Sequence, residues 1–116
     1  MKKRIYVIED DQIMLLVLES VLIKNDYEVI KDFNGKNVMV HKKPYPDLYI
    51  IDINLIGIDG CEYCKLIKEE SKTTPVILIS ASIDLEKKAK ECKADRFMTK
   101  PFVMQDLLVS IQELIS

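Results

Sequence analysis

Short, almost uninterrupted apolar runs alternate with longer amphipathic segments along the whole chain. The run at residues 4–8 is rich in β-branched residues and is predicted to be a buried strand, and the runs at 47–53 and 75–81 are almost as continuously apolar. The segments 27–33 and 95–100 are predicted to be two further strands. Strands that lack polar alternation are typical of parallel sheets covered on both faces. The pattern therefore predicts a sheet with helices on both sides.

Five further segments are predicted to be helices, and they span residues 12–25, 36–43, 61–70, 83–93 and 103–116. In the first, Met14, Leu18 and Leu22 recur at helical spacing, and Asp11 is placed to cap the N-terminus. The second is short, contains two valines and stops before a proline. Strict alternation of strands and helices predicts one α/β domain, a doubly wound parallel sheet over residues 1–116.

Composition narrows the class of protein further. The 116 residues are 48% apolar and 31% charged, which is ordinary for one globular domain with a real core. The net charge of -2 gives no general reason to expect a nucleic acid or a membrane surface as partner. No apolar run is long enough for a signal peptide or a membrane-spanning helix. We therefore expect a cytoplasmic protein.

Three cysteines, an odd number, argue against a disulfide framework. Cys61 and Cys64 form a C-x-x-C motif near a predicted strand–helix junction, as in thioredoxin-like redox proteins. Two cysteines one helical turn apart would also serve as small hydrophobic residues on a buried face, and the lack of any other redox feature nearby favours that interpretation. Cys92 and His41 lack the paired spacing of a zinc site.

Polar side chains stand at the carboxyl ends of four predicted strands. Glu9 and Asp10 follow the first strand, Asp52 lies at the end of the third, Ser80 at the end of the fourth and Lys100 at the end of the fifth. In a doubly wound sheet, binding sites form at the carboxyl ends of the strands. We therefore expect these five groups to meet at one edge.

The chemistry of this set points to a phosphoryl group and a metal. Three crowded carboxylates repel one another and need a counter-charge, and Mg²⁺ prefers oxygen ligands. The Lys100 ammonium and the Ser80 hydroxyl both suit an anionic oxygen. An ionised aspartate beside them is a candidate nucleophile toward phosphorus. Alone, Asp52 would be read as a turn residue and the first two acids as helix caps; their convergence favours the functional interpretation.

Four segments, VIEDD, IIDINLIGIDG, PVILISAS and ADRFMTKPF, together resemble in order and spacing the motifs of bacterial two-component response-regulator receiver domains. The resemblance covers essentially the whole chain. It implies a flavodoxin-like (βα)5 fold with strand order 2-1-3-4-5, as in single-domain chemotaxis regulators. It also implies a phosphorylation-dependent signalling switch that takes a phosphoryl group from a histidine kinase or phosphotransfer protein. Such a switch is not a conventional enzyme, although it supports its own phosphoryl transfer and autodephosphorylation.

The resemblance assigns a role to each residue of the acidic group. Asp52 matches the phosphoacceptor. Mg²⁺ is expected to bind Asp10 directly, Glu9 through water, Asp52, and the backbone carbonyl of Asn54.

The resemblance also assigns the residues around the phosphoryl group. Ser80 and Lys100 match the hydroxyl and the lysine that bind phosphoryl oxygens, and Ser80 and Phe97 match the pair that switches conformation. The Lys100–Pro101 peptide bond is expected to be cis. Asn54 and Ser82 fall at the positions that modulate the dephosphorylation rate.

Two positions depart from the family pattern. Ile56 stands where proline is usual, so the loop after the third strand is expected to be less rigid. Lys93 stands where glycine is usual, so the backbone geometry of the turn at that point is open to question. Neither belongs to the chemical set.

The resemblance further implies that residues 83–116 form the face that docks a downstream protein or output domain and, in some members, a phosphorylation-dependent dimer. Lysines on the helix predicted for residues 83–93 would favour an acidic partner. The competing hypothesis is a constitutive interaction module that kept the fold and lost signalling. The sequence leaves open whether the chain is stand-alone or part of a longer protein.

Overall fold

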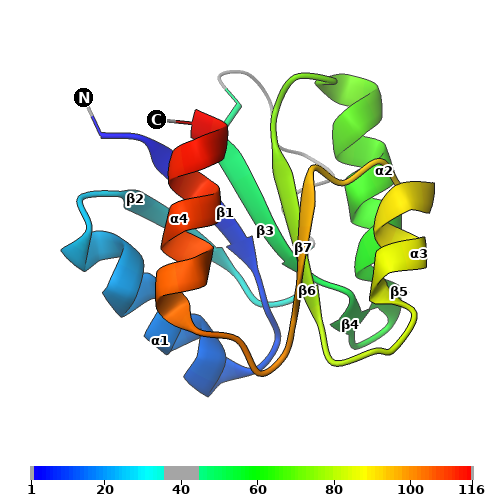
Figure 1. Cartoon of the computed structure of the whole chain (residues 1–116), viewed down its shortest axis with the longest axis horizontal. Helices are drawn as coiled ribbons and strands as arrows, with labels where there is room; N and C mark the ends of the chain where they lie inside the picture. Colours follow the sequence, from blue (N-terminus) through cyan, green and yellow to red (C-terminus); the bar gives the residue numbers. More distant parts are fainter. Residues whose placement is uncertain (1, 36–44, 116) are drawn as a thin grey trace.

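The computed structural model describes residues 2–35 and 45–115. Its core is a sheet of five parallel strands in the order β2-β1-β3-β6-β7 (Figure 1). These strands are β1 (Arg4–Ile8), β2 (Glu28–Asp32), β3 (Leu48–Asp52), β6 (Val76–Ser80) and β7 (Arg96–Thr99). Since β6 and β7 are the fourth and fifth predicted strands, the expected order 2-1-3-4-5 is confirmed.

Helices cover both faces of this sheet: α1 (Gln12–Lys24) and α4 (Met104–Ile115) lie on one face, α2 (Gly60–Glu70) and α3 (Leu85–Glu91) on the other (Figure 1). Asp11 caps α1 as predicted, because its carboxylate accepts hydrogen bonds from the Ile13 and Met14 amides. The helix predicted for residues 36–43, and with it His41, lies outside the described residues. None of the helices within residues 2–35 and 45–115 is long and apolar enough to cross a membrane.

Two hydrophobic clusters, one on each face, explain the unbroken apolar runs. Along β1, Ile5 and Val7 pack toward α1 and α4, whereas Tyr6 and Ile8 pack toward α2 and α3. All four side chains are at most 1% exposed. Burying one such side chain stabilises a fold by about 1.5–3 kcal/mol. A strand covered on both sides therefore has no position at which a polar residue is favoured.

A short antiparallel hairpin, which the apolar pattern did not predict, follows β3. It consists of β4 (Asn54–Leu55) and β5 (Ile58–Asp59), joined by Ile56 and Gly57. Gly57 has a φ of 88°, a value that glycine adopts without steric cost. The hairpin carries the chain from the end of β3 to the start of α2.

The junction between this hairpin and α2 is closely packed. The Gly60 amide donates to the Ile53 carbonyl at 2.8 Å, and a Cβ on Gly60 would lie 2.2 Å from the Asp52 carbonyl oxygen. Asp59 caps α2 by accepting from the Cys61 amide at 2.8 Å. Asp59 and Gly60 therefore shape the loop and the helix start.

Lys93 lies just after α3 with a φ of 63°, in the left-handed region. This is the conformation that glycine commonly adopts after a helix, which explains why glycine is usual at this position. The turn therefore keeps the geometry that a glycine would give, at a strain of about 1 kcal/mol for the lysine.

Candidate functional site

The parallel sheet brings the five polar groups together at its carboxyl edge. Glu9 and Asp10 directly follow β1, and Asp52 is the last residue of β3. Because β1 and β3 are hydrogen-bonded neighbours, these ends lie side by side. Ser80 ends β6 on the other side of β3, and Lys100 follows β7.

Three carboxylates form the centre of the site. One oxygen from each of Glu9, Asp10 and Asp52 lies within 4.8 Å of the others. Glu9 is fully buried and Asp52 is 4% exposed, whereas Asp10 is half-buried. In the part of the chain that the structure describes, this is the one group of acidic, histidine or cysteine ligands close enough to hold an ion. An all-oxygen set fits Mg²⁺.

Lys100 forms hydrogen-bonded ion pairs with two of these carboxylates. Its Nζ lies 2.9 Å from Glu9 Oε1 and 3.0 Å from Asp52 Oδ2. Burial lowers the pKa of Lys100, but its hydrogen bonds to both carboxylates outweigh burial and raise that pKa overall. The lysine is therefore a permanent cation in the site. The Lys100–Pro101 peptide bond is cis, as expected.

Unfavourable electrostatic interactions remain at the Glu9 carboxyl group. Burial and its contact with the Asp52 carboxylate raise the pKa of Glu9 to about 7, although Lys100 acts in the opposite direction. One ammonium group thus does not fully compensate three carboxylates. A divalent cation among the oxygens would remove this repulsion.

Asn54 has a contact that sequence reasoning missed. Besides donating its amide to Asp52 Oδ1 at 3.0 Å, it donates its side-chain Nδ2 to Ser80 Oγ at 3.0 Å. The Ser82 amide also donates to Ser80 Oγ, at 3.0 Å. A hydroxyl oxygen that accepts two hydrogen bonds still has its own hydrogen to donate. Ser80 is therefore arranged as a donor toward an anion.

Ile56, the unusual residue of the loop, also contacts the site. Its amide donates to Asp10 Oδ2 at 3.1 Å, while its side chain is 87% exposed. A proline at this position would have no N–H to donate. The departure from the family pattern thus adds a hydrogen bond to one of the acids and ties the loop to the site.

Phe97 lies on β7 with its side chain 41% exposed. Core packing therefore does not account for this aromatic residue. Its assignment to the switch stays a prediction.

The family model for the response regulator receiver domain matches residues 5–112 of the chain. The chain belongs to this family. Among curated relatives, the response regulator ArlR of Staphylococcus epidermidis is 34% identical over 115 residues. That alignment covers 96% of this chain and 52% of the relative, so the chain spans about half the length of the curated proteins it matches.

Solved structures agree on the fold of this receiver domain. A putative response regulator from Chloroflexus aurantiacus superposes with a TM-score of 0.92 at 28% identity, covering 99% of this chain and 98% of the other. The chemotaxis protein CheY4 of Vibrio cholerae gives a TM-score of 0.88 at 23% identity, covering 98% of this chain and 99% of the other. The second likeness supports the fold alone.

Membership of the family sets the general function. A receiver domain is a phosphoacceptor switch of a two-component system rather than an enzyme in the ordinary sense. Receiver domains bind Mg²⁺, and the acidic cluster of this chain is consistent with that. Membership of the family also implies a histidine kinase as partner.

Proposed function

We propose that Asp52 accepts a phosphoryl group from a histidine kinase or phosphotransfer protein, with Mg²⁺ bound beside it. One observation carries the proposal. The Asp52 carboxylate, only 4% exposed, shares a cluster with the oxygens of Glu9 and Asp10 and contacts the Lys100 ammonium at 3.0 Å. A nucleophile, a set of metal ligands and a cation for the phosphoryl oxygens are thereby united at one point.

In this transfer, a carboxylate oxygen of Asp52 bonds to phosphorus while the bond from phosphorus to the donor's imidazole nitrogen breaks. The electron pair stays on that nitrogen, which takes up a proton. Lys100 and the Ser80 hydroxyl bind the phosphoryl oxygens through charge and hydrogen bonding. Glu9, Asp10, Asp52 and the carbonyl of Asn54 would hold Mg²⁺, which supplies positive charge for the oxygens when it is bound.

The phosphoryl group then changes the balance between two conformations of the domain. Ser80 turns toward the new anion and Phe97 follows it inward, which alters the face formed by residues 83–116. That face docks the downstream protein, output domain or second copy. Asn54 and Ser82, both bonded to Ser80, influence how fast water removes the phosphoryl group.

The deciding experiment is incubation with Mg²⁺ and acetyl phosphate, followed by intact mass measurement. We expect the mass of one added phosphoryl group on the wild type and none on Asp52→Asn. Asp11→Asn is the matched control, because Asp11 caps α1 and asparagine caps as well as aspartate. If the wild type gains no adduct, or if Asp52→Asn keeps it, the chain is the constitutive interaction module instead.

Metal binding is tested separately, by thermal unfolding. Mg²⁺ that binds only the folded chain raises the unfolding midpoint as its concentration increases. We expect this rise in the wild type and in Asp11→Asn, and its loss in Asp10→Asn. A rise of equal size in Asp10→Asn would show that Mg²⁺ binds elsewhere.

A further inference from the structure

The three cysteines of the chain meet at one place between α2 and α3. Cys61 and Cys64 lie one turn apart on α2, and Cys92 is the C-cap of α3. The Cys64 Sγ lies 3.4 Å from the Cys92 carbonyl oxygen, and the Cys92 thiol forms hydrogen bonds with the thiols of both other cysteines. All three are free thiols. Cys61 and Cys64 lie on a buried face of α2, as the sequence favours, and Cys92 belongs to the same hydrophobic cluster.

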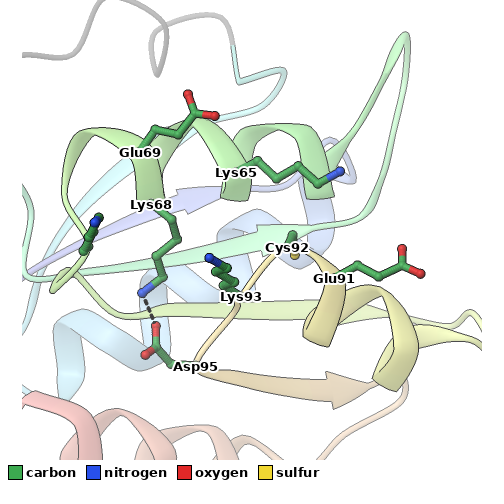
Figure 2. Close-up of a pocket in the computed structure, with 8 residues that line it drawn as sticks. Lys65, Lys68, Glu69, Glu91, Cys92, Lys93 and Asp95 are labelled. Atoms are coloured by element: carbon green, nitrogen blue, oxygen red, sulfur yellow. Dashed lines mark hydrogen bonds and ion pairs between the residues drawn. The ribbon is translucent and has the colours of Figure 1, made fainter.

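A pocket opens onto this cluster from the surface. It has a volume of about 480 Å³ and lies between α2 and the segment from Glu91 to Asp95 (Figure 2). Cys92 lines the pocket, although its side chain is only 2% exposed. A molecule a little larger than water fits easily into such a space. The pocket therefore leads a small reagent to the edge of the core at Cys92, whose side chain is nearly covered.

The surroundings favour the thiolate of Cys92. Four lysines and three acidic residues line the pocket, and one of these lysines, Lys68, is held by Asp95 at 2.6 Å (Figure 2). Hydrogen bonds from the Cys64 and Cys61 thiols lower the pKa of Cys92 below its usual range, against the effect of its burial. The thiolate, rather than the thiol, is the form that reacts with oxidants.

We propose that Cys92 and Cys64 form an oxidisable thiol pair that peroxide converts into a disulfide joining α3 to α2. The Cys92 thiolate attacks one oxygen of hydrogen peroxide, the O–O bond breaks and the other oxygen leaves as water after protonation. The Cys64 sulfur then attacks the resulting sulfenic acid, an S–S bond forms and a second water leaves. Two thiols are oxidised by two electrons, and one peroxide is reduced to two waters.

Cys64 is the partner because its sulfur contacts both the backbone and the thiol of Cys92. Cys61 also contacts the Cys92 thiol, but its sulfur lies 3.8 Å from the Lys88 carbonyl and not against the backbone of Cys92. Burial, followed by its contact with Cys92, raises the pKa of Cys61 to about 12, so the first cysteine of the motif lacks the reactivity of a thioredoxin-type nucleophile. The reactive pair thus bridges two helices rather than the two ends of the C-x-x-C motif.

The disulfide would restrain a helix that connects two parts of the phosphoryl site. On the chain, α3 lies between β6, which ends at Ser80, and β7, which carries Phe97.

The thiol pair itself does not depend on phosphoryl transfer. We expect it to form equally in wild type and in Asp52→Asn, so its failure and the failure of the proposed phosphoryl transfer are distinguishable.

The experiment is treatment of the reduced, folded chain with hydrogen peroxide, followed by blocking of remaining thiols, digestion and peptide mass mapping without reduction. We expect a Cys64–Cys92 cross-link and a blocked Cys61. The same treatment in denaturant is the control, because in an unfolded chain the short C-x-x-C loop closes most easily and Cys61–Cys64 should dominate. The folded structure therefore predicts a change of partner.

Variants identify the role of each cysteine. Cys61→Ser should still form the cross-link, Cys64→Ser should leave a Cys92 sulfenic acid that dimedone traps, and Cys92→Ser should slow peroxide consumption roughly tenfold. Near-ultraviolet circular dichroism checks that each variant is folded. The proposal is wrong if the folded wild type links Cys61 to Cys64 or Cys92, or remains uncross-linked at peroxide concentrations that oxidise the unfolded chain.

Discussion

Ser80 shows how neighbouring donors can prepare a single hydroxyl for an anion. Its oxygen accepts from the Asn54 side chain and from the Ser82 amide, each at 3.0 Å. The acceptor capacity of the oxygen is thereby used, and the remaining hydrogen is directed to a new partner. One of the two donors is a backbone group, so only the Asn54 contact can be removed by side-chain substitution.

Asn54→Ala should therefore slow phosphoryl acceptance from acetyl phosphate about fivefold, the equivalent of about 1 kcal/mol for one net hydrogen bond. The measurement is the time course of the mass adduct at fixed Mg²⁺. Asn25→Ala is the matched control, because its side-chain amide donates to the Val21 carbonyl at the end of α1 and not to the site. Equal slowing in both variants would show that the effect is not specific to Ser80.

At the scale of elements, the apolar pattern predicted the strands whose side chains are buried. The strand predicted for residues 47–53 is β3, Leu48–Asp52, and every residue in it is buried. The hairpin of β4 and β5 was missed because two-residue strands have no periodicity. Its signal was the pair Leu55 and Ile58 flanking a two-residue turn that contains glycine.

Side-chain partners were less predictable than positions. Parallel pairing fixes where strand ends meet, so the convergence of Glu9, Asp52 and Lys100 followed from the order of strands alone. The bond from Asn54 to Ser80 and the contact of Cys64 with Cys92 depend instead on side-chain rotamers and on where helices lie. These partners are 26 and 28 residues apart, and no local pattern marks them.

Gly60 links an element boundary to the site. A methyl group there would lie 2.2 Å from the Asp52 carbonyl oxygen, which α2 or the end of β3 can relieve only by moving. Gly60→Ala should lower the free energy of unfolding by about 3 kcal/mol, as for severe overpacking, and should reduce phosphoryl acceptance. Urea unfolding and the mass adduct measure the two effects.

Gly57→Ala provides the comparison for this prediction. No atom lies within 4 Å of a Cβ at Gly57, so the cost is the strain of its positive φ alone, about 1 kcal/mol. Phosphoryl acceptance should persist in this variant. Equal losses of stability in the two variants would argue against the close approach at Gly60.

At the scale of the whole molecule, the buried tyrosines make the free energy of unfolding change with pH in the alkaline range. Tyr49 is 2% exposed and packs 5.2 Å from Tyr6, measured between ring centroids. Burial raises the pKa of Tyr49 to about 12. In the unfolded chain a tyrosine ionises near its ordinary pKa of about 10. Between these values the folded chain keeps a proton that the unfolded chain releases.

The contribution of the protonated Tyr49 to the free energy of unfolding should therefore be complete below about pH 10. The free energy of unfolding should fall as the pH rises toward 12, by up to about 1.4 kcal/mol per pH unit for this one group. Urea unfolding at a series of pH values from neutral to alkaline measures the slope. Tyr49→Phe should make the slope shallower. A slope that is unchanged in this variant would exclude Tyr49 as the source.

The ion pair between Lys100 and Glu9 joins residues 91 positions apart. During synthesis on the ribosome, β1, β3 and β6 are complete before Lys100 has left the exit tunnel, whereas a domain generally folds as a unit. The Glu9 and Asp52 carboxylates therefore gain their ammonium partner only after nearly the whole domain has been made. A chain that ended before Lys100 would need a proton or a cation from solution in place of this ammonium group.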